Sequence, residues 1–379
     1  MGARTRGIAN NILSDGLDAT DGLSGALSSS NITNASVTNV TSTPSIGGGF
    51  EKVASDPPSP TEGDIWYNTT SNTVKGYVLA TTAAAWATGG NTSTTRYARG
   101  GFGIQTAALR CGGESNAIPD YEYSTAVEEY DGSSWTAGTA LPSSASRQSG
   151  AGILTAGLMF GGSSPTTPGN TTKLYDGTTW TSSGNMTTTR YDLGGNGTPT
   201  AAFAFGGADT APPFGVRTTA ESFSSGTWTS ETGLNTARLS LGCAPQEPGS
   251  SGLAYGGYAP SIPGRTQATE EWNGTAWSTV NSMVSPARQD IGGAGTQTSA
   301  LGFGGSLAPT RTNATEAYDG TSWSTDVALN VTRSRAVGSG SASAALAVGG
   351  YDGVSTNNAS LATEEYSAAA IEAQTKTLG

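Results

Sequence analysis

The chain has 379 residues, of which 55 are glycine and only 12% are charged, and its formal net charge is −11 at pH 7. This charge argues against a nucleic-acid partner, because binding to a phosphate backbone needs clustered lysine and arginine. The sequence contains no histidine, on which Ser-His-Asp and Cys-His nucleophiles and most zinc and copper sites depend. We therefore expect a protein that is not an enzyme and that holds no cofactor and no metal.

No stretch approaches 18 consecutive apolar residues, and the opening residues lack the pattern of a secretory signal. We therefore expect synthesis in the cytoplasm and no insertion into a membrane. The two cysteines, Cys111 and Cys243, occupy non-equivalent positions in distant parts of the sequence. We expect both to be small buried side chains without a disulfide.

Residues 1–60 are predicted to form an extended arm. Its middle, Ser24–Ser45, is a low-complexity run of serine, threonine and asparagine with interspersed isoleucine and valine. Such a composition cannot build a hydrophobic core alone. The arm is therefore expected to become ordered on a partner, for example by adding strands to another subunit.

Residues 61–80 are predicted to form a β-hairpin linker, because Gly63-Asp-Ile-Trp-Tyr-Asn and Thr73-Val-Lys-Gly-Tyr flank a turn of polar residues. Together with the preceding Asp56-Pro-Pro-Ser-Pro, this segment resembles those of bacteriophage virion proteins, especially tail-fibre and appendage chains. The opening Ala3–Leu13 resembles the N-terminal attachment segments of such fibres. The resemblance implies a virion location, other virion proteins as partners and a homo-oligomer, with a trimer preferred. It also implies attachment through Arg4, Arg6, Ile8, Ile12 and Leu13.

Residues 81–366 carry a sixfold repeat at intervals of 43 to 51 residues, which sets the architecture. In the copy that spans Arg288–Trp323, four strands are expected, at Ile291–Gly295, Ala300–Phe303, Ala314–Tyr318 and Thr321–Thr325. The last two strands are expected to be joined by a two-residue type I′ turn at Asp319-Gly320, which needs positive φ at both residues.

The order Arg, Gly-x-Gly, Gly-Gly, Glu-Glu-Tyr-Asp-Gly and Trp resembles the kelch repeat. The resemblance implies an all-β fold, a six-bladed kelch-type β-propeller. Glycine is expected in the innermost strands, where they crowd around a central channel. Copy three carries Ser222-Phe223 and Gly226 in place of Tyr-Asp-Gly, which leaves the turn type of its hairpin open.

The ends of the repeat complete each other. The last copy lacks its tryptophan, whereas Trp86 precedes the first arginine. We therefore predict that a strand at Ala84–Thr88 joins the last copy, whose strands are expected at Ala336–Gly340, Ala344–Val348 and Ala362–Tyr366. This pairing would close the ring and remove a free sheet edge. Residues 367–379 are expected to be a C-terminal tail, frayed or briefly helical.

One arginine leads the innermost strand of each copy, and six of them are candidate ligand-binding residues near one mouth of the channel. They are Arg96, Arg147, Arg190, Arg238, Arg288 and Arg335. Such a cluster could bind an acidic sugar, a lipopolysaccharide phosphate or the carboxylates of a partner. The favoured alternative is that each arginine pairs with a repeated glutamate or a loop carbonyl. The pairs Glu128-Glu129, Glu270-Glu271 and Glu364-Glu365 are expected to be structural, because adjacent strand residues point to opposite faces.

Six irregular loops between the second and third strands of each copy are expected on one face, where differing loops on a uniform scaffold encode recognition. The candidate recognition residues in or beside them are Tyr121, Tyr123, Phe214, Arg217, Tyr258, Arg265, Arg311 and Tyr351. We expect a tail-fibre or appendage protein whose arm docks to the virion and whose propeller recognises a host surface glycan or receptor. The alternative is an architectural component, namely a nozzle, a collar or a capsid decoration, with the propeller packed on other virion proteins.

Overall fold

The structure is a computed structural model that describes residues 51–97, 100–115, 122–164, 167–209, 215–261, 264–353 and 359–378. Within these ranges every regular element is a β-strand, and none of them forms a helix long and apolar enough to cross a membrane. The chain divides into two compact units, Met1–Ala83 with Ala369–Gly379, and Ala84–Ala368. The predicted attachment residues Arg4, Arg6, Ile8, Ile12 and Leu13 lie outside the described residues.

The larger unit contains six four-stranded antiparallel sheets, here called sheets 1 to 6. Sheets 1 to 3 consist of β5 (Gly100–Ile104), β6 (Ala107–Cys111), β9 (Val127–Tyr130) and β10 (Trp135–Ala137); β11 (Ser149–Ile153), β12 (Ala156–Phe160), β13 (Thr172–Tyr175) and β14 (Trp180–Ser182); and β15 (Gly194–Thr198), β16 (Ala201–Phe205), β17 (Ala220–Ser224) and β18 (Thr227–Glu231).

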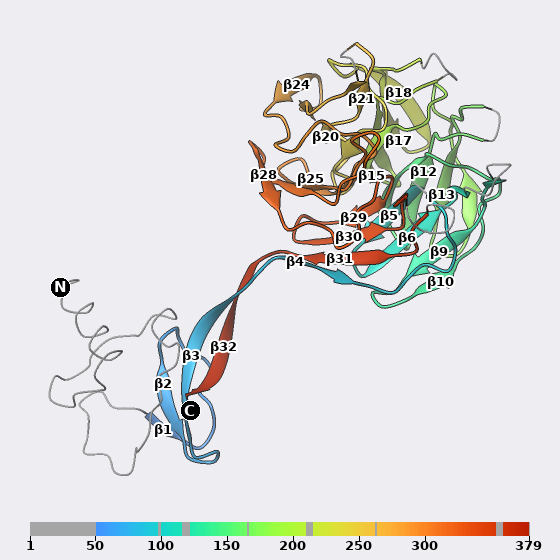
Figure 1. Cartoon of the computed structure of the whole chain (residues 1–379). Helices are drawn as coiled ribbons and strands as arrows, with labels where there is room; N and C mark the ends of the chain where they lie inside the picture. The colour runs from blue at the N-terminus through green and yellow to red at the C-terminus, as the bar shows by residue number, and fades with distance from the viewer. Residues whose placement is uncertain are drawn as a thin grey trace. The chain divides into compact units, whose positions relative to one another are not determined.

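Sheets 4 to 6 consist of β19 (Gly242–Cys243), β20 (Gly252–Tyr255), β23 (Thr269–Trp272) and β24 (Trp277–Val280); β25 (Gly292–Thr296), β26 (Ser299–Phe303), β27 (Thr315–Tyr318) and β28 (Trp323–Asp326); and β29 (Val337–Gly340), β30 (Ala344–Val348), β31 (Thr363–Ser367) and β4 (Ala85–Thr88). Figure 1 shows the sheets grouped around a common centre, with β25, β29 and β5 nearer the middle than β28, β24 and β10. This all-β arrangement is consistent with a β-propeller.

The first strands of neighbouring sheets approach one another so closely that side chains are excluded. A Cβ atom on Gly150 would collide with the carbonyl oxygen of Gly101 in sheet 1, and one on Gly338 would collide with Gly293 in sheet 5. A narrow channel of about 60 Å³ is lined by Gly101, Gly150, Gly195, Gly293 and Gly338 from five sheets and by Cys243 from the sixth. The steric reason for the glycine-rich strands is therefore present in the structure.

Both cysteines are free thiols, as expected, but only Cys111 is buried. Cys243 is half-buried because it lines the channel, so the expectation of a buried side chain is wrong for it. The first strand of sheet 4 is only two residues long and ends at Cys243. Just after it, the side-chain amide of Gln246 donates to the carbonyl oxygen of Gly103 in sheet 1 at 2.8 Å.

The strand that was predicted to complete the last copy is present. β4 pairs antiparallel with β31, and Trp86 lies opposite Tyr366. The Trp86 indole nitrogen donates to Oγ1 of Thr315 at 3.2 Å and to the carbonyl oxygen of Val327 at 3.1 Å, both in sheet 5. A segment from the start of the repeat thereby joins the sheet formed by its end.

The tryptophans connect each sheet to its neighbour through the indole nitrogen. Trp135 donates to Oγ1 of Thr363 at 2.8 Å, and Trp228 donates to Oγ1 of Thr172, also at 2.8 Å. The position of this threonine is occupied by Ala220 in sheet 3, and the buried Nε1 of Trp277 has no hydrogen-bond partner. One of the repeated connections between sheets is therefore incomplete.

The predicted type I′ turn is wrong for the copy in which it was predicted. Tyr318 pairs with Trp323 across a four-residue connection, and only Gly320 in it has positive φ. The Asp319 carboxylate instead accepts hydrogen bonds from the backbone of Thr321 and Ser322, which stabilises the longer turn. Copy three, whose turn type was open, has the two-residue turn: Ser225 and Gly226 both have positive φ, between Ser224 and Thr227.

The smaller unit is a four-stranded sheet in the order β1 (Glu51–Val53), β2 (Ile65–Asn68), β3 (Thr73–Thr82) and β32 (Ala370–Leu378). The predicted hairpin is present as β2 and β3. The predicted C-terminal tail is wrong, because β32 pairs with β3 over nine residues, from Val74–Leu378 to Thr82–Ala370. Backbone pairing with a distant segment stabilises this strand, so its own sequence pattern carries little signal.

The last part of the predicted arm also belongs to this sheet, since β1 pairs with β2. The Asp56 carboxylate accepts hydrogen bonds from Lys75 at 2.7 Å, Asn68 at 2.8 Å and Trp66 at 3.1 Å. The hydrogen bond from Lys75, followed by those from Asn68 and Trp66, lowers the pKa of Asp56 to about 2. The proline-rich segment is thus anchored to the hairpin rather than being a free linker.

A chain of residues 84–368 and a chain of residues 89–368 differ only in the segment that contains β4. We expect the shorter chain to melt at a lower temperature and less cooperatively, because its loss uncovers Phe303 and Tyr366, which pack on Trp86. Circular dichroism melting curves measure this difference. Identical melting curves would contradict a structural role for β4.

The substitution Ala220→Thr would place a hydroxyl where four of the other sheets use one to accept from tryptophan. We expect it to raise the free energy of unfolding by about 1 kcal/mol, because the indole nitrogen of Trp277 gains an acceptor. Val127→Thr is the matched control, since Trp180 already donates to the carbonyl oxygen of Thr139 at 2.9 Å. Denaturant titration measures both variants, and an equal gain in both would sink this explanation.

Candidate functional site

Five buried arginines, four from the predicted set together with Arg333, form ion pairs with repeated glutamates and are here called the bracket arginines. The pairs are Arg96–Glu128, Arg190–Glu221, Arg238–Glu270, Arg288–Glu316 and Arg333–Glu364. No side chain among the ten is more than 3% exposed. These arginines are not accessible to a ligand.

Four of the brackets fasten a Gly-Gly corner to the third strand, whereas Arg288 donates to the carbonyl oxygen of Gly302 in the second strand. Arg190 donates from Nη1 to the carbonyl oxygens of Gly206 at 3.0 Å and Thr219 at 2.7 Å, and from Nη2 to Glu221 at 2.9 Å. Glu221 also accepts the backbone N–H of Thr187 at 2.7 Å. Burial alone would raise the pKa of Glu221, but the hydrogen bonds from Thr188 and Thr187 and the charge of Arg190 outweigh it, so that pKa lies below its ordinary value.

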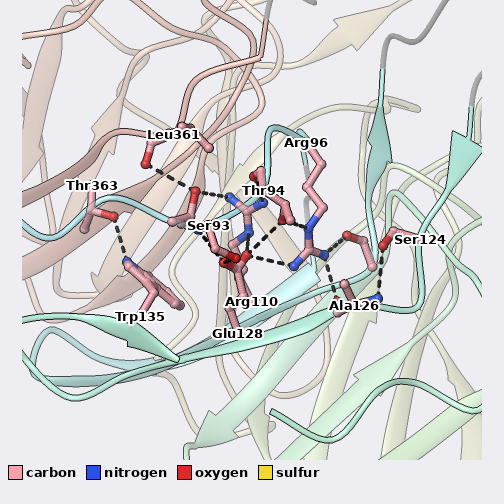
Figure 2. Close-up of polar contacts among 12 residues, drawn as sticks. Ser93, Thr94, Arg96, Arg110, Ser124, Ala126, Glu128, Trp135, Leu361 and Thr363 are labelled. Carbon is pink, nitrogen blue, oxygen red and sulfur yellow. Dashed lines mark hydrogen bonds and ion pairs between the residues drawn. The ribbon is translucent and has the colours of Figure 1, made fainter. Parts of the chain in front are cut away.

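Figure 2 shows the bracket of sheet 1, in which a second arginine takes part. Arg96 and Arg110 both reach Oε2 of Glu128, at 2.9 and 3.2 Å, and Ser93 donates to Oε1 of the same carboxylate. Burial, with the nearby Arg96 charge, lowers the pKa of Arg110 to about 9. One glutamate in this sheet therefore pairs with two cations.

The prediction of six equivalent arginines is wrong for Arg147 and Arg335. In sheet 6 the bracket position is taken by Arg333, two residues before Arg335. In sheet 2 the bridge of Ser146 with Ser163 matches that of Tyr191 with Ala208, so Ala145 occupies the bracket position. Lys173 replaces the glutamate there. Lys173 is the residue from which the missing bracket of sheet 2 could have been predicted, because a bracket arginine beside it would bury two cations together.

The favoured alternative, pairing with repeated glutamates, is thus confirmed for Arg96, Arg190, Arg238 and Arg288. The second glutamate of each Glu-Glu pair is also structural. Glu271 accepts the hydroxyl of Tyr318 in the next sheet at 2.7 Å, and Glu129 and Glu365 accept those of Tyr175 and Tyr130 in the same way. Burial, and then the hydrogen bond to Glu365, raises the pKa of Tyr130 to about 12, which keeps its hydroxyl a donor.

Arg147 and Arg335 belong to a different set, here called the mouth ring, whose members lie two residues before the first strands of sheets 2 to 6. The set is Arg147, Asp192, Ser240, Asp290 and Arg335, and every member has φ between 55° and 61°. The backbone N–H of each later member donates to the carbonyl oxygen of the member before it, at 2.8 to 3.1 Å. Positive φ in residues other than glycine is uncommon and persists where the surroundings impose it.

A hollow of about 370 Å³ lies beside the mouth ring, a volume within the range of small-ligand sites. It is lined by Tyr97, Glu114, Arg147, Gln289, Asp290, Ser306, Arg311, Ser334, Arg335 and Tyr351. These residues come from the segments that precede the first strands of sheets 1, 2, 5 and 6 and from the connections between the second and third strands of sheets 1, 5 and 6. Arg335 also lines the channel.

Two guanidinium groups in the hollow share one carboxylate. Arg147 reaches Oε1 of Glu114 at 3.1 Å and Arg335 reaches the same oxygen at 3.3 Å. Glu114 is 2% exposed, whereas the two arginines are 28% and 29% exposed. Burial alone would lower the pKa of Arg147, but the charges of Asp192 and Glu114 outweigh it and raise that pKa.

Of the predicted recognition residues, Arg311 and Tyr351 line the hollow, with the Arg311 guanidinium 4.0 Å from the centre of the Tyr351 ring. The others are elsewhere. Tyr123 pairs with Glu114 between β8 (Glu122–Tyr123) and β7 (Glu114–Ser115), and Tyr258 pairs with Arg265 between β21 (Tyr258–Ala259) and β22 (Gly264–Arg265). Arg217 pairs with Asp209. Tyr121 and Phe214 lie outside the described residues.

Sequence reasoning missed Tyr97, Glu114 and Asp290. Tyr97 follows a bracket arginine and Glu114 follows a Gly-Gly pair, so both resembled structural repeat positions. Only the approach of sheet 1 to sheets 2 and 6 brings them to Arg147 and Arg335. Among the described residues, no group of acidic or cysteine side chains is placed to hold a metal ion.

No family model and no curated protein matches this sequence. The chain is similar to a solved structure described as "Structure of YjhT", with a TM-score of 0.60 and 14% identity. The match covers 74% of this chain and 99% of that one. At this identity the likeness shows the fold alone, an all-β assembly of four-stranded sheets.

Replacing one member of a bracket leaves the other charge buried without its partner. We expect Arg190→Leu to cost about 3–5 kcal/mol of the free energy of unfolding. The matched control is Arg217→Leu, because the Arg217–Asp209 pair is 50% and 22% exposed and such pairs contribute about 0–1 kcal/mol. Denaturant titration measures both, and similar small losses would show that the bracket does not support the fold.

Proposed function

We propose that the larger unit is a six-bladed kelch-type β-propeller whose ring is closed by β4. The order of contacts supports closure, because Gly101 of sheet 1 approaches Gly150 of sheet 2 on one side and Val337 of sheet 6 on the other. Sheets 5 and 6 approach in the same way through Gly293 and Gly338. Each of the six sheets then serves as one blade.

We further propose that the chain is a non-enzymatic structural protein of a bacteriophage, a component of a tail fibre or appendage. Its N-terminal arm docks to other virion proteins, the assembly is a homo-oligomer, and the propeller recognises a glycan or receptor on the host surface. The resemblance of the arm and hairpin to virion proteins supports the location. The observation that supports recognition of a glycan or receptor is the polar hollow beside the mouth ring.

The hollow differs from the rest of the repeat in how its charges are used. Each bracket arginine pairs with a glutamate inside the fold, with both charged side chains buried. The second glutamates of the Glu-Glu pairs accept tyrosine hydroxyls of the next sheet. In the hollow, Arg147, Arg335 and Tyr351 remain accessible at the surface. A rigid ring that presents a few accessible polar and aromatic groups from different blades is a typical binding site.

Adsorption of the labelled full chain to cells of candidate hosts tests this function. We expect saturable binding that Arg311→Gln reduces at least fivefold, because this arginine lines the hollow beside Tyr351. Arg217→Gln is the matched control, since Arg217 lies in another irregular loop and does not line the hollow. Absence of adsorption to any host, together with incorporation of the chain into particles, would refute recognition and favour an architectural role.

A further inference from the structure

The hollow carries a local excess of positive charge on a protein whose net charge is −11. Its lining includes three arginines, Arg147, Arg311 and Arg335, against two carboxylates, Glu114 and Asp290. Asp290 lies 3.5 Å from Nε of Arg335. An acidic protein that concentrates cations at one accessible place favours a ligand with negative charge there.

The two central arginines have donors left over. Arg147 uses Nε and Nη2 on Glu114, and Arg335 uses Nη1 on Glu114 and Nε toward Asp290. Among the described residues, Nη1 of Arg147 and Nη2 of Arg335 donate no hydrogen bond. A guanidinium has five N–H donors in a planar fork that matches a carboxylate.

Glu114 fixes the position of these donors. Because it is nearly fully buried and its Oε1 meets both guanidinium groups, it holds them side by side with their exposed edges facing the hollow. Arg147 and Arg335 are further held by the backbone bonds of the mouth ring. A carboxylate that enters the hollow would therefore meet preorganised donors, which lowers the entropic cost of binding.

The remaining lining suits a sugar ring. Tyr351 is accessible and meets the buried Tyr97 edge to face, with ring centres 5.5 Å apart, and Ser306 and Gln289 supply hydroxyl and amide groups. The volume of about 370 Å³ lies at the lower end of ligand sites, which fits one or two sugar units. The overall negative charge of the protein disfavours a densely charged polyanion.

We propose that the hollow binds a saccharide that carries a carboxylate, with the carboxylate seated on Arg147 and Arg335. This inference rests on the proposed recognition of a host glycan and specifies its chemical class. The sugar ring lies against the accessible Tyr351, and its hydroxyl groups meet the Ser306 and Gln289 side chains of the lining.

The test uses the full chain with D-glucuronate and D-glucose as probes, measured by saturation-transfer NMR and calorimetry. We expect glucuronate to bind at least tenfold more tightly than glucose, and its affinity to fall as sodium chloride is added. Acetate carries the carboxylate without the ring, and it is expected to compete only at concentrations at least tenfold above those of glucuronate. Equal competition by acetate would overturn the saccharide assignment.

Arg147→Gln and Arg335→Gln are each expected to weaken glucuronate binding at least tenfold, whereas Arg217→Gln leaves it unchanged. Removing either arginine also disturbs Glu114, so Arg147→Lys and Arg335→Lys provide a second test, with melting curves as the check on folding. Lysine keeps the positive charge but lacks the planar fork of donors. If the lysine variants fold and bind glucuronate with the parental affinity, the proposed binding of the carboxylate to these two arginines is overturned.

The outcomes separate this inference from the proposed function. Equal binding of glucose and glucuronate would overturn the carboxylate assignment and leave glycan recognition intact. Binding of neither sugar by a chain that still adsorbs to host cells would overturn the inference alone. A chain that does not adsorb to any host would overturn the proposed function itself.

Discussion

The buried pairing of a bracket arginine with a glutamate is the interaction on which the rest of the structure depends. It joins three parts of one sheet: the loop before the first strand, the Gly-Gly corner after the second, and the third strand. Burying both charges costs solvation, and Nε of Arg190, Arg238 and Arg288 has no partner. The bracket is therefore better understood as a device that specifies one geometry than as a source of net stability.

Sheet 2 lacks the bracket and still keeps the fold of its neighbours. Both members are changed together, to Ala145 and Lys173, and burial lowers the pKa of the remaining lysine. The strand register of this sheet nevertheless matches that of its neighbours. A single sheet can thus keep its shape through strand pairing and packing when its neighbours hold it on both sides, which is how repeat architectures distribute stability.

Features that depend on local pattern or on the repeat could be predicted from the sequence. The four strands per copy, the glycine-rich first strands and the pairing of Trp86 with the last copy follow from period and register. The distinction between Arg333 and Arg335 could not be predicted from the repeated arginine alone, because it depends on which residue faces the glutamate. The strand at Ala370–Leu378 was missed because its stability comes from β3, almost 300 residues away.

The candidate site could be predicted in part. Arg147, Arg335, Arg311 and Tyr351 were recognised as candidates, but for the first two the reason was wrong, since they are not bracket residues. Glu114 was overlooked because nothing in its local sequence marks it. Its importance arises from the meeting of residues from three sheets, and such a meeting is visible only when the sheets are placed around one centre.

The pairing of β3 with β32 has a consequence for the neighbouring pairing of β4 with β31 in sheet 6. Thr82 lies opposite Ala370, and only three residues further along the chain Ala85 lies opposite Ser367. β3 and β32 are therefore tied to each other along the chain next to β4 and β31, and β4 is held at a high effective concentration beside β31. A strand of four paired residues would fray readily on its own, but its separation from β31 is opposed by the nine paired residues of β3 and β32. The first and last segments of the repeat are thus held together by two successive pairings, of which the shorter one depends on the longer.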